Sequence, residues 1–179
     1  MSDISSLLKD VIREVPDFPI PGILFKDISP IFLDPKLIEL SAQSLAEAWK
    51  GQRIDKVIGI DSRGFLLGPR MATLLDAGFV MVRKKGKLPP ETVQVSYELE
   101  YGNATLESIV ESIQPGERVI IHDDLLATGG TAAAAAQLAV QTGGEVAGFS
   151  FIVSLSYLLG SNKLTPYSGN IHALIDFDK

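Results

Sequence analysis

The sequence has no cysteine among its 179 residues. This absence excludes a disulfide scaffold, a zinc–thiolate site, an iron–sulfur cluster and a cysteine nucleophile, and it fits a reducing compartment. A chain of this length buries roughly 70% of the surface that its unfolded form exposes, so it needs no such cross-links to fold. We therefore expect a single domain that spans residues 1–179.

Positive charge is also scarce. The 16 Lys and Arg residues are outnumbered by 22 Asp and Glu residues, which leaves a net charge of −6 and argues against a broad nucleic-acid-binding surface. The first residues lack a basic segment followed by an apolar run, and no apolar stretch reaches the roughly 18 residues of a membrane-spanning helix. We expect a cytoplasmic protein with neither a nucleic-acid nor a membrane partner.

Apolar segments rich in β-branched residues alternate with helix-like segments along the chain. The apolar runs are nearly continuous, which is typical of parallel strands that helices cover on both faces. Strands are predicted at 56–60, 79–83, 118–121, 146–153 and 171–175, and helices at 35–49, 65–77 and about 130–142. The repeated strand–helix–strand order predicts a doubly wound α/β fold.

Two stretches do not fit this pattern. Residues 15–22 are rich in proline, and residues 84 to about 106 form an insertion between predicted elements. Ligands of doubly wound folds bind at the carboxyl edge of the sheet. We expect both stretches to lie outside the sheet and to form walls over this edge.

The clearest functional pattern is RVIIHDDLLATGGT, residues 118–131. It predicts a buried strand that ends in two carboxylates, followed by a glycine turn that starts a helix. Backbone N–H groups at a helix N-terminus bind anions, and glycines let a phosphate approach closely. Adjacent carboxylates can accept hydrogen bonds from ribose hydroxyls. The segment is therefore predicted to bind a ribose 5-phosphate through Asp123, Asp124, Ala127, Thr128, Gly129, Gly130 and Thr131.

The alternative for this segment is a tight turn in which Asp124 and Thr128 act only as local caps. The strand, the acidic pair, the glycines and the flanking hydroxyls all occur in register, which favours the phosphate site.

A second glycine-containing turn, IDSRGF, covers residues 60–65. Gly59 and Gly64 have the spacing of a P-loop, but Phe65-Leu66 replaces the Lys-Ser/Thr pair that would hold nucleotide phosphates and magnesium. The pattern therefore argues against a nucleoside triphosphatase. Arg63 and the nearby backbone N–H groups are suited to pyrophosphate, because guanidinium groups bind phosphates in a bidentate manner.

Four cations occur within residues 83–87, RKKGK, and an apolar segment, FPIPGILFKDISP, occupies residues 18–30. Alone, the basic run would be a solvated face, and the apolar segment would fill the core. Beside a phosphate site, the basic run is better interpreted as an arm that closes over pyrophosphate.

Taken in order, these segments resemble those of the type I phosphoribosyltransferases. DSRGF, LEYG at 99–102 and PGILFKDISP resemble the adenine-specific branch of that family in particular. The resemblance runs from about residue 10 to the C-terminus. It implies a mainly parallel, twisted sheet flanked by helices, with a small hood from about 15–30 and a flexible loop at about 84–106. The chain departs from the family pattern at His122, where an aliphatic residue is usual.

The resemblance also implies a reaction in which 5-phosphoribosyl 1-pyrophosphate and adenine give AMP and pyrophosphate. Magnesium would be held mainly by substrate and water, without a dedicated protein site, and the protein would form a homodimer. A cis peptide bond is implied near Asp61–Ser62. The implied residues are Asp61, Ser62, Arg63, Arg83, Lys84 and Lys87 for pyrophosphate; Leu24, Phe25 and Lys26 for adenine; and Glu100, Tyr101 and Arg63 for catalysis.

Two other functions stay open at this point. The same fold could serve hypoxanthine or xanthine, or it could be a non-catalytic ligand-sensing regulator, because a fold does not dictate a function. His122 and His172 are isolated from each other and from any metal-ligand spacing. We expect both histidines to have structural roles.

Overall fold

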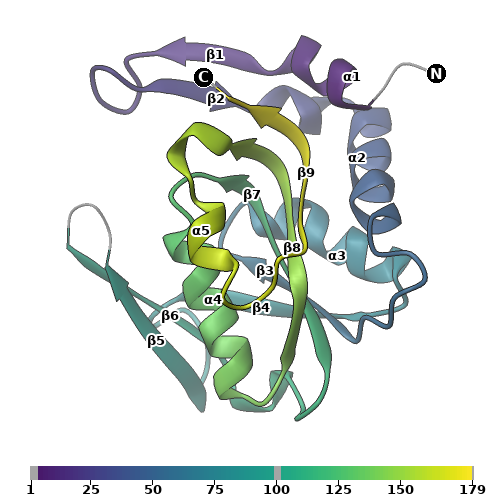
Figure 1. Cartoon of the computed structure of the whole chain (residues 1–179), viewed down its shortest axis with the longest axis vertical. Coiled ribbons are helices and arrows are strands. Elements are labelled where there is room, and N and C mark those ends of the chain that lie inside the picture. The colour runs from purple at the N-terminus through teal and green to yellow at the C-terminus, as the bar shows by residue number, and fades with distance from the viewer. Residues whose placement is uncertain (1–3, 99–101, 179) are drawn as a thin grey trace.

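The computed structural model describes residues 4–98 and 102–178. They form a seven-stranded sheet with helices on both faces and a separate two-stranded hairpin (Figure 1). The order of strands in the large sheet is β5-β6-β4-β3-β7-β8-β9. These strands span Lys56–Ile60 (β3), Gly78–Lys84 (β4), Thr92–Glu98 (β5), Asn103–Ile109 (β6), Arg118–Leu126 (β7), Glu145–Leu155 (β8) and Ile171–Phe177 (β9).

All five predicted strands are present, and they run parallel to one another as β4-β3-β7-β8-β9. The prediction ended β7 too early, at residue 121, where the polar residues begin. Pairing with β8 continues to Leu126, because backbone hydrogen bonds do not require apolar side chains. The extension carries the acidic pair on regular strand backbone.

Helices lie on both faces of the sheet (Figure 1). The three predicted helices correspond to α2 (Pro35–Glu47), α3 (Gly64–Leu74) and α4 (Gly130–Gln141), whereas α1 (Ile4–Val11) and α5 (Ser161–Leu164) were not predicted. Short 3-10 turns span Ser29–Leu33 (η1), Val110–Ser112 (η2) and Ser156–Leu158 (η3). α4 and α5 cover one face, and α1, α2 and α3 cover the other.

The sheet divides the core into two layers. On the α4 side, four of the five consecutive alanines are buried against the sheet, beside Phe149 and Phe151. Their small side chains let α4 lie close to the strands. On the other side, Trp49, Leu67 and Met71 are fully buried. These packed layers fix the strand ends from which the site is built.

The insertion after β4 does not lie outside the sheet, contrary to the prediction. It forms β5 and most of β6, which extend the sheet at one edge. β6 pairs antiparallel with β4, and β5 pairs antiparallel with β6. Val93, Val95 and Tyr97 alternate with polar residues and pack against the α4 layer. This period of two is the strand signal that the prediction overlooked.

The N-terminal segment forms a hairpin of β1 (Arg13–Pro16) and β2 (Leu24–Asp27). The hairpin lies above the carboxyl ends of β7, β8 and β9 (Figure 1), which is where the prediction placed it. None of the helices within residues 4–98 and 102–178 is long and apolar enough to cross a lipid bilayer.

Candidate active site

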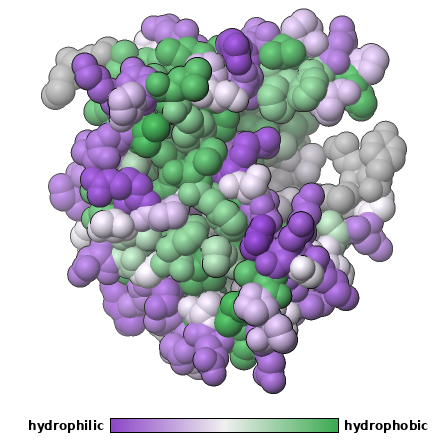
Figure 2. Space-filling model, turned by 180° about the vertical axis from the view of Figure 1, so that it is seen from behind, coloured by the Kyte–Doolittle hydropathy of each residue, from purple (hydrophilic) through white to green (hydrophobic). Residues whose placement is uncertain are grey.

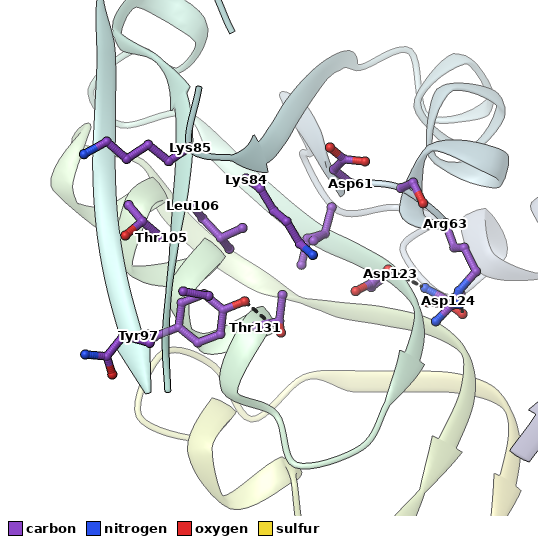
Figure 3. A pocket seen from close by; sticks show the side chains of 14 residues that line it. Asp61, Arg63, Lys84, Lys85, Tyr97, Thr105, Leu106, Asp123, Asp124 and Thr131 are labelled. Carbon is purple, nitrogen blue, oxygen red and sulfur yellow. Dashed lines mark hydrogen bonds and ion pairs between the residues drawn. The ribbon is translucent and has the colours of Figure 1, made fainter. Parts of the chain in front are cut away.

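A cavity of about 750 Å³ opens where β3 and β7 end, beside the first turn of α4 and the β5–β6 hairpin (Figure 3). Its size falls within the roughly 300–1,000 Å³ that is typical of small-molecule sites. The cavity brings together the two turns that the sequence assigned to ribose phosphate and to pyrophosphate. It is lined by Ile60, Asp61, Ser62, Arg63, Lys84, Lys85, Tyr97, Asn103, Ala104, Thr105, Leu106, Asp123, Asp124 and Thr131.

The acidic pair at the end of β7 has two different environments. Asp124 is nearly buried, and its Oδ2 accepts a hydrogen bond from Nε of Arg63 at 2.5 Å. Asp123 is more accessible, and its Oδ1 accepts the backbone N–H of Asp124 at 2.9 Å. Burial and the neighbouring charge of Asp124 raise the pKa of Asp123 well above the usual aspartate value. Asp124 is therefore a fixed partner of Arg63, and Asp123 is the carboxylate available to a ligand.

The turn before α4 encloses a second cavity of about 90 Å³, lined by Asp123 and residues 125–132. Gly129 has a φ of +76°, and among the described residues no side chain caps the helix there. The first N–H groups of α4 have no partner within the helix, and the helix dipole favours an anion at this position. Both cavities include Asp123 and Thr131, so an anion here would adjoin the acidic pair.

Gly160, between η3 and α5, supports this turn from behind. A Cβ on Gly160 would overlap with the carbonyl oxygen of Ala127 and lie 2.9 Å from the nitrogen of Gly129. A Cβ on Gly129 would in turn overlap with the carbonyl oxygen of Gly160. The contact is thus between two backbones. Gly160 was not predicted as a site residue, because a lone glycine far along the chain gives no signal of such a contact.

The turn after β3 lies across the cavity from α4. The Asp61–Ser62 peptide bond is cis, as the resemblance implied. Oδ2 of Asp61 accepts a hydrogen bond from Nε of Arg83 at 3.0 Å. A Cβ on Gly64 would lie 2.7 Å from the carbonyl oxygen of His122, so glycine allows α3 to begin directly against β7.

The cations of the basic run face in different directions. Lys84 lines the cavity, as does Lys85, which the prediction did not single out. Figure 3 shows the Lys84 side chain extending from β4 toward Asp123. Arg83 and Lys87 were also predicted to contact pyrophosphate, but they are not among the lining residues. Nη1 of Arg83 instead donates to the carbonyl oxygen of Lys87 at 3.1 Å.

The β5–β6 hairpin forms one wall of the cavity. The hydroxyl of Tyr97 lies 3.3 Å from that of Thr131, so the hairpin contacts the start of α4 (Figure 3). Tyr97 was not predicted as a site residue, although its place in the alternating pattern of β5 could have indicated it. Glu100 and Tyr101, which were predicted to act in catalysis, lie outside the described residues.

The residues predicted to bind adenine are on β2 and line neither cavity. The Leu24 side chain is exposed, and Phe25 packs edge-on against Phe18 with ring centres 5.0 Å apart. The Lys26 ammonium forms an ion pair with Glu14 and lies 4.1 Å from the centre of the Phe177 ring. The Lys26 side chain is therefore engaged within the fold and reaches neither cavity.

The two histidines have structural surroundings, in agreement with the expectation. His122 is fully buried, and its Nδ1–H donates to the carbonyl oxygen of Ser150 at 3.0 Å. Within the described part of the chain, no group bonds to its Nε2. Burial lowers the pKa of His122 to about 4. His172 is exposed and packs edge-on against Trp49, with ring centres 4.9 Å apart.

We predict that His122 makes the fold sensitive to acid. The unfolded chain binds a proton at His122 near pH 6.5, whereas the folded chain does so only near pH 4. Stability from this group is therefore complete above pH 6.5 and is lost as the pH falls toward 4. Relative to a His122→Val variant, the wild-type protein should lose about 2 kcal/mol of unfolding free energy between pH 7.5 and pH 5.

Urea denaturation of both proteins at several pH values measures this difference. Asp123 titrates in both proteins, so its opposite effect cancels in the comparison. Parallel pH dependences of the two proteins would refute the role of His122.

Comparison with known proteins gives a consistent result. Residues 32–154 match the model of the phosphoribosyl transferase domain family. An adenine phosphoribosyltransferase of Sorangium cellulosum is 53% identical over 163 residues, which cover 91% of this chain and 82% of that protein.

Two solved structures share the fold over nearly the whole chain. The crystal structure of adenine phosphoribosyltransferase from Rhodothermus marinus is 49% identical, covers 99% of this chain and 100% of its own, and gives a TM-score of 0.91. The enzyme from Saccharomyces cerevisiae, complexed with D-2,5-dideoxy-2,5-imino-altritol 1,6-bisphosphate and adenine, is 40% identical, with coverages of 97% and 99% and a TM-score of 0.90. The chain therefore belongs to the adenine phosphoribosyltransferase family.

Proposed function

We propose that this family member transfers the 5-phosphoribosyl group of 5-phosphoribosyl 1-pyrophosphate to adenine, giving AMP and pyrophosphate in purine salvage, and that the substrates bind in the two adjoining cavities. One observation carries the proposal. An accessible carboxylate, Asp123, lies between the uncapped N-terminus of α4 and the turn that holds Arg63. This spacing suits a ligand with an anion at each end and hydroxyl groups between them. The adenine and bisphosphate ligands in the yeast enzyme's structure support this assignment.

The acidic pair also suits the chemistry of the transfer. The bond between the anomeric carbon and a pyrophosphate oxygen breaks, a bond to a ring nitrogen of adenine forms, and that nitrogen loses its proton. Positive charge develops on the sugar during this exchange, as in glycoside hydrolysis. Asp123 and Asp124 stabilise that charge, because they are fixed before the reaction begins. Burial strengthens the interaction by excluding water.

Pyrophosphate takes its ligands from Arg63, Lys84 and the N–H groups of the 61–64 turn, with Lys85 nearby. The phosphate at the other end binds the first turn of α4. Adenine lies under the hairpin, where backbone groups of Leu24 and Lys26 recognise its amino edge and Phe25 lies beside the ring. Glu100 and Tyr101 act at the base and the ribose, a role that rests on the resemblance of LEYG alone.

A magnesium ion fits this donor set as part of the bound substrate. Among residues 4–98 and 102–178, no three His, Asp or Glu side chains form a group that could hold a metal ion. Near the cavity, Asp61 and Asp124 are already paired with arginines. Magnesium keeps several waters and binds substrate phosphates through few protein ligands. When bound, it neutralises the charge of the leaving pyrophosphate.

A homodimer is part of the proposal. The face seen in Figure 2 has a broad hydrophobic area, and large exposed apolar side chains occur on η1, α2, α3 and β4, namely Leu33, Leu40, Leu66, Leu74 and Met81. Contiguous apolar surface of this kind marks an interaction site.

Because 5-phosphoribosyl 1-pyrophosphate is too highly charged to cross membranes unaided, the enzyme acts in the cytoplasm.

The proposed reaction predicts base selectivity. In the presence of 5-phosphoribosyl 1-pyrophosphate and magnesium, pyrophosphate release should be at least about 100-fold faster with adenine than with hypoxanthine, guanine or xanthine. The wrong base leaves hydrogen-bonding groups of the base site buried and unpaired. Continuous measurement of pyrophosphate release gives the rates.

The variant with both Asp123→Asn and Asp124→Asn substitutions is the control for the site. It should bind 5-phosphoribosyl 1-pyrophosphate far more weakly while remaining folded. Preference for another purine would change the substrate assignment, and turnover of no base would favour the sensing regulator.

The phosphate turn predicts a specific effect of Gly160→Ala. The φ of Gly160 is −60°, which alanine adopts freely, so the substitution tests only the overlap of a Cβ with the backbone of Ala127 and Gly129. Displacement of the turn should raise the Kd of ribose 5-phosphate at least about tenfold, or roughly 1.4 kcal/mol, as measured by titration calorimetry.

Gly148→Ala is the matched control. A Cβ there would overlap with the carbonyl oxygen of Asn170 and with Trp49, far from the phosphate turn. It should lower the melting temperature but leave the Kd within about twofold. Equal changes of Kd in both variants would contradict a local role for Gly160.

The dimer proposal predicts a molecular mass in solution of twice 19.3 kDa. Leu66, on α3, is 49% exposed. Leu66→Glu places a charge among these apolar side chains and should shift the protein toward the monomer. Val140→Glu is the control, because Val140 is 52% exposed on α4, on the opposite face. Light scattering during gel filtration measures the masses. A monomeric wild-type protein would refute the dimer.

A further inference from the structure

Glu107, on β6, is a buried carboxylate that the proposed reaction does not use. Glu107 is only 2% exposed to solvent. It is paired in register with Arg83 on one neighbouring strand and with Gln94 on the other. The adjacent pair, Lys84 and Leu106, both line the cavity. Because successive side chains of a strand point to opposite faces, Glu107 and Arg83 lie on the face opposite to Lys84 and Leu106, and neither lines the cavity.

The Glu107 carboxylate holds the turn that follows β4. Its Oε1 accepts the backbone N–H of Lys87 at 2.8 Å and that of Leu88 at 2.9 Å, and the N–H of Gly86 is a further donor. A concavity of successive N–H groups is a binding site for an anion, and here the protein supplies that anion itself. Burial raises the pKa of Glu107, but these hydrogen bonds outweigh burial and keep the pKa below its usual value.

A chain of contacts runs from this turn to the pyrophosphate turn. The carbonyl oxygen of Lys87 accepts a hydrogen bond from Nη1 of Arg83, and Nε of Arg83 donates to Asp61. The guanidinium is therefore fixed between two acceptors, one on each turn. If the 86–88 turn moved, Arg83 would lose one acceptor, and Asp61 would lose its rigid partner.

We propose that Glu107 is a positioning residue for pyrophosphate binding, which acts by fixing the 86–88 turn and, through it, Arg83 against Asp61. The inference rests on the proposed function, because it assigns the cavity beside Asp61 to pyrophosphate. It explains why two of the four cations in the basic run are not at the cavity. Arg83 and the Lys87 backbone hold the turns in place, whereas the Lys84 side chain extends into the cavity (Figure 3).

Binding of magnesium pyrophosphate and of AMP, measured by calorimetry, tests the proposal. Glu107→Ala leaves the three N–H groups without an acceptor and should raise the Kd of pyrophosphate about 30-fold. AMP has no group at the pyrophosphate position, so its Kd should stay within about twofold. Glu107→Gln keeps one carbonyl acceptor and should restore most of the pyrophosphate affinity.

Glu117→Gln is the matched control. Glu117 also accepts a backbone N–H, that of Gln114 at 2.8 Å, and it pairs with Lys56 at the amino ends of the central strands β3 and β7. Its substitution should change neither Kd. In steady-state assays, Glu107→Ala should raise the KM for 5-phosphoribosyl 1-pyrophosphate more than it lowers kcat.

Three outcomes would overturn the proposal. An unchanged pyrophosphate Kd in Glu107→Ala, or in Arg83→Met if the alanine variant does not fold, would show that pyrophosphate binding does not depend on the contacts that run from Glu107 through Arg83 to Asp61. An equal loss of AMP and pyrophosphate affinity would show a general structural role. If the wild-type protein itself bound neither ligand, the proposed function would fail together with this inference.

Discussion

The hydrogen bond between Arg63 and Asp124 is the interaction on which the arrangement of the site depends. It joins the turn after β3 to the end of β7, and these two strands are parallel neighbours in the centre of the sheet. Parallel neighbours deliver their following turns to the same edge. Two segments about 60 positions apart in the sequence therefore form one cavity, and the charge of Arg63 is held where its carboxylate partner is nearly buried.

The site separates fixed charge from available charge. Asp124 is committed to Arg63, and Arg83 is committed to Asp61 and to the carbonyl oxygen of Lys87. Asp123 and Lys84 remain at the cavity surface. In a protein with a net charge of −6, such internal pairing keeps a few positive groups at the anion site. Electrostatic preorganisation of this kind avoids the cost of reorienting dipoles during a reaction.

Much of this arrangement could be predicted from the sequence, because its signals are local. The continuous apolar runs indicated the parallel strands, and the glycine turn after the acidic pair indicated the uncapped start of α4. Other features depend on contacts between distant segments. The orientation of Arg83 away from the cavity is set by its register with Glu107, and the role of Gly160 by a backbone contact with Ala127. Neither leaves a pattern within its own segment. The β5–β6 hairpin was missed for a different reason. Its alternation is visible in the sequence, but the segment was interpreted as an insertion with a basic arm that closes over pyrophosphate.

The attachment of that hairpin has a mechanical consequence. β6 pairs with β4 at only two positions, Arg83↔Glu107 and Lys84↔Leu106, whereas β5 and β6 pair with each other at seven. The backbone of the hairpin is therefore attached to the sheet over a short length in the middle of β6, and the packing of β5 beside α4 supplies the rest of its support. Lys84 belongs to one of the two pairs and also lines the cavity. The same short attachment thus sets both the position of the hairpin wall and the position of a cavity cation.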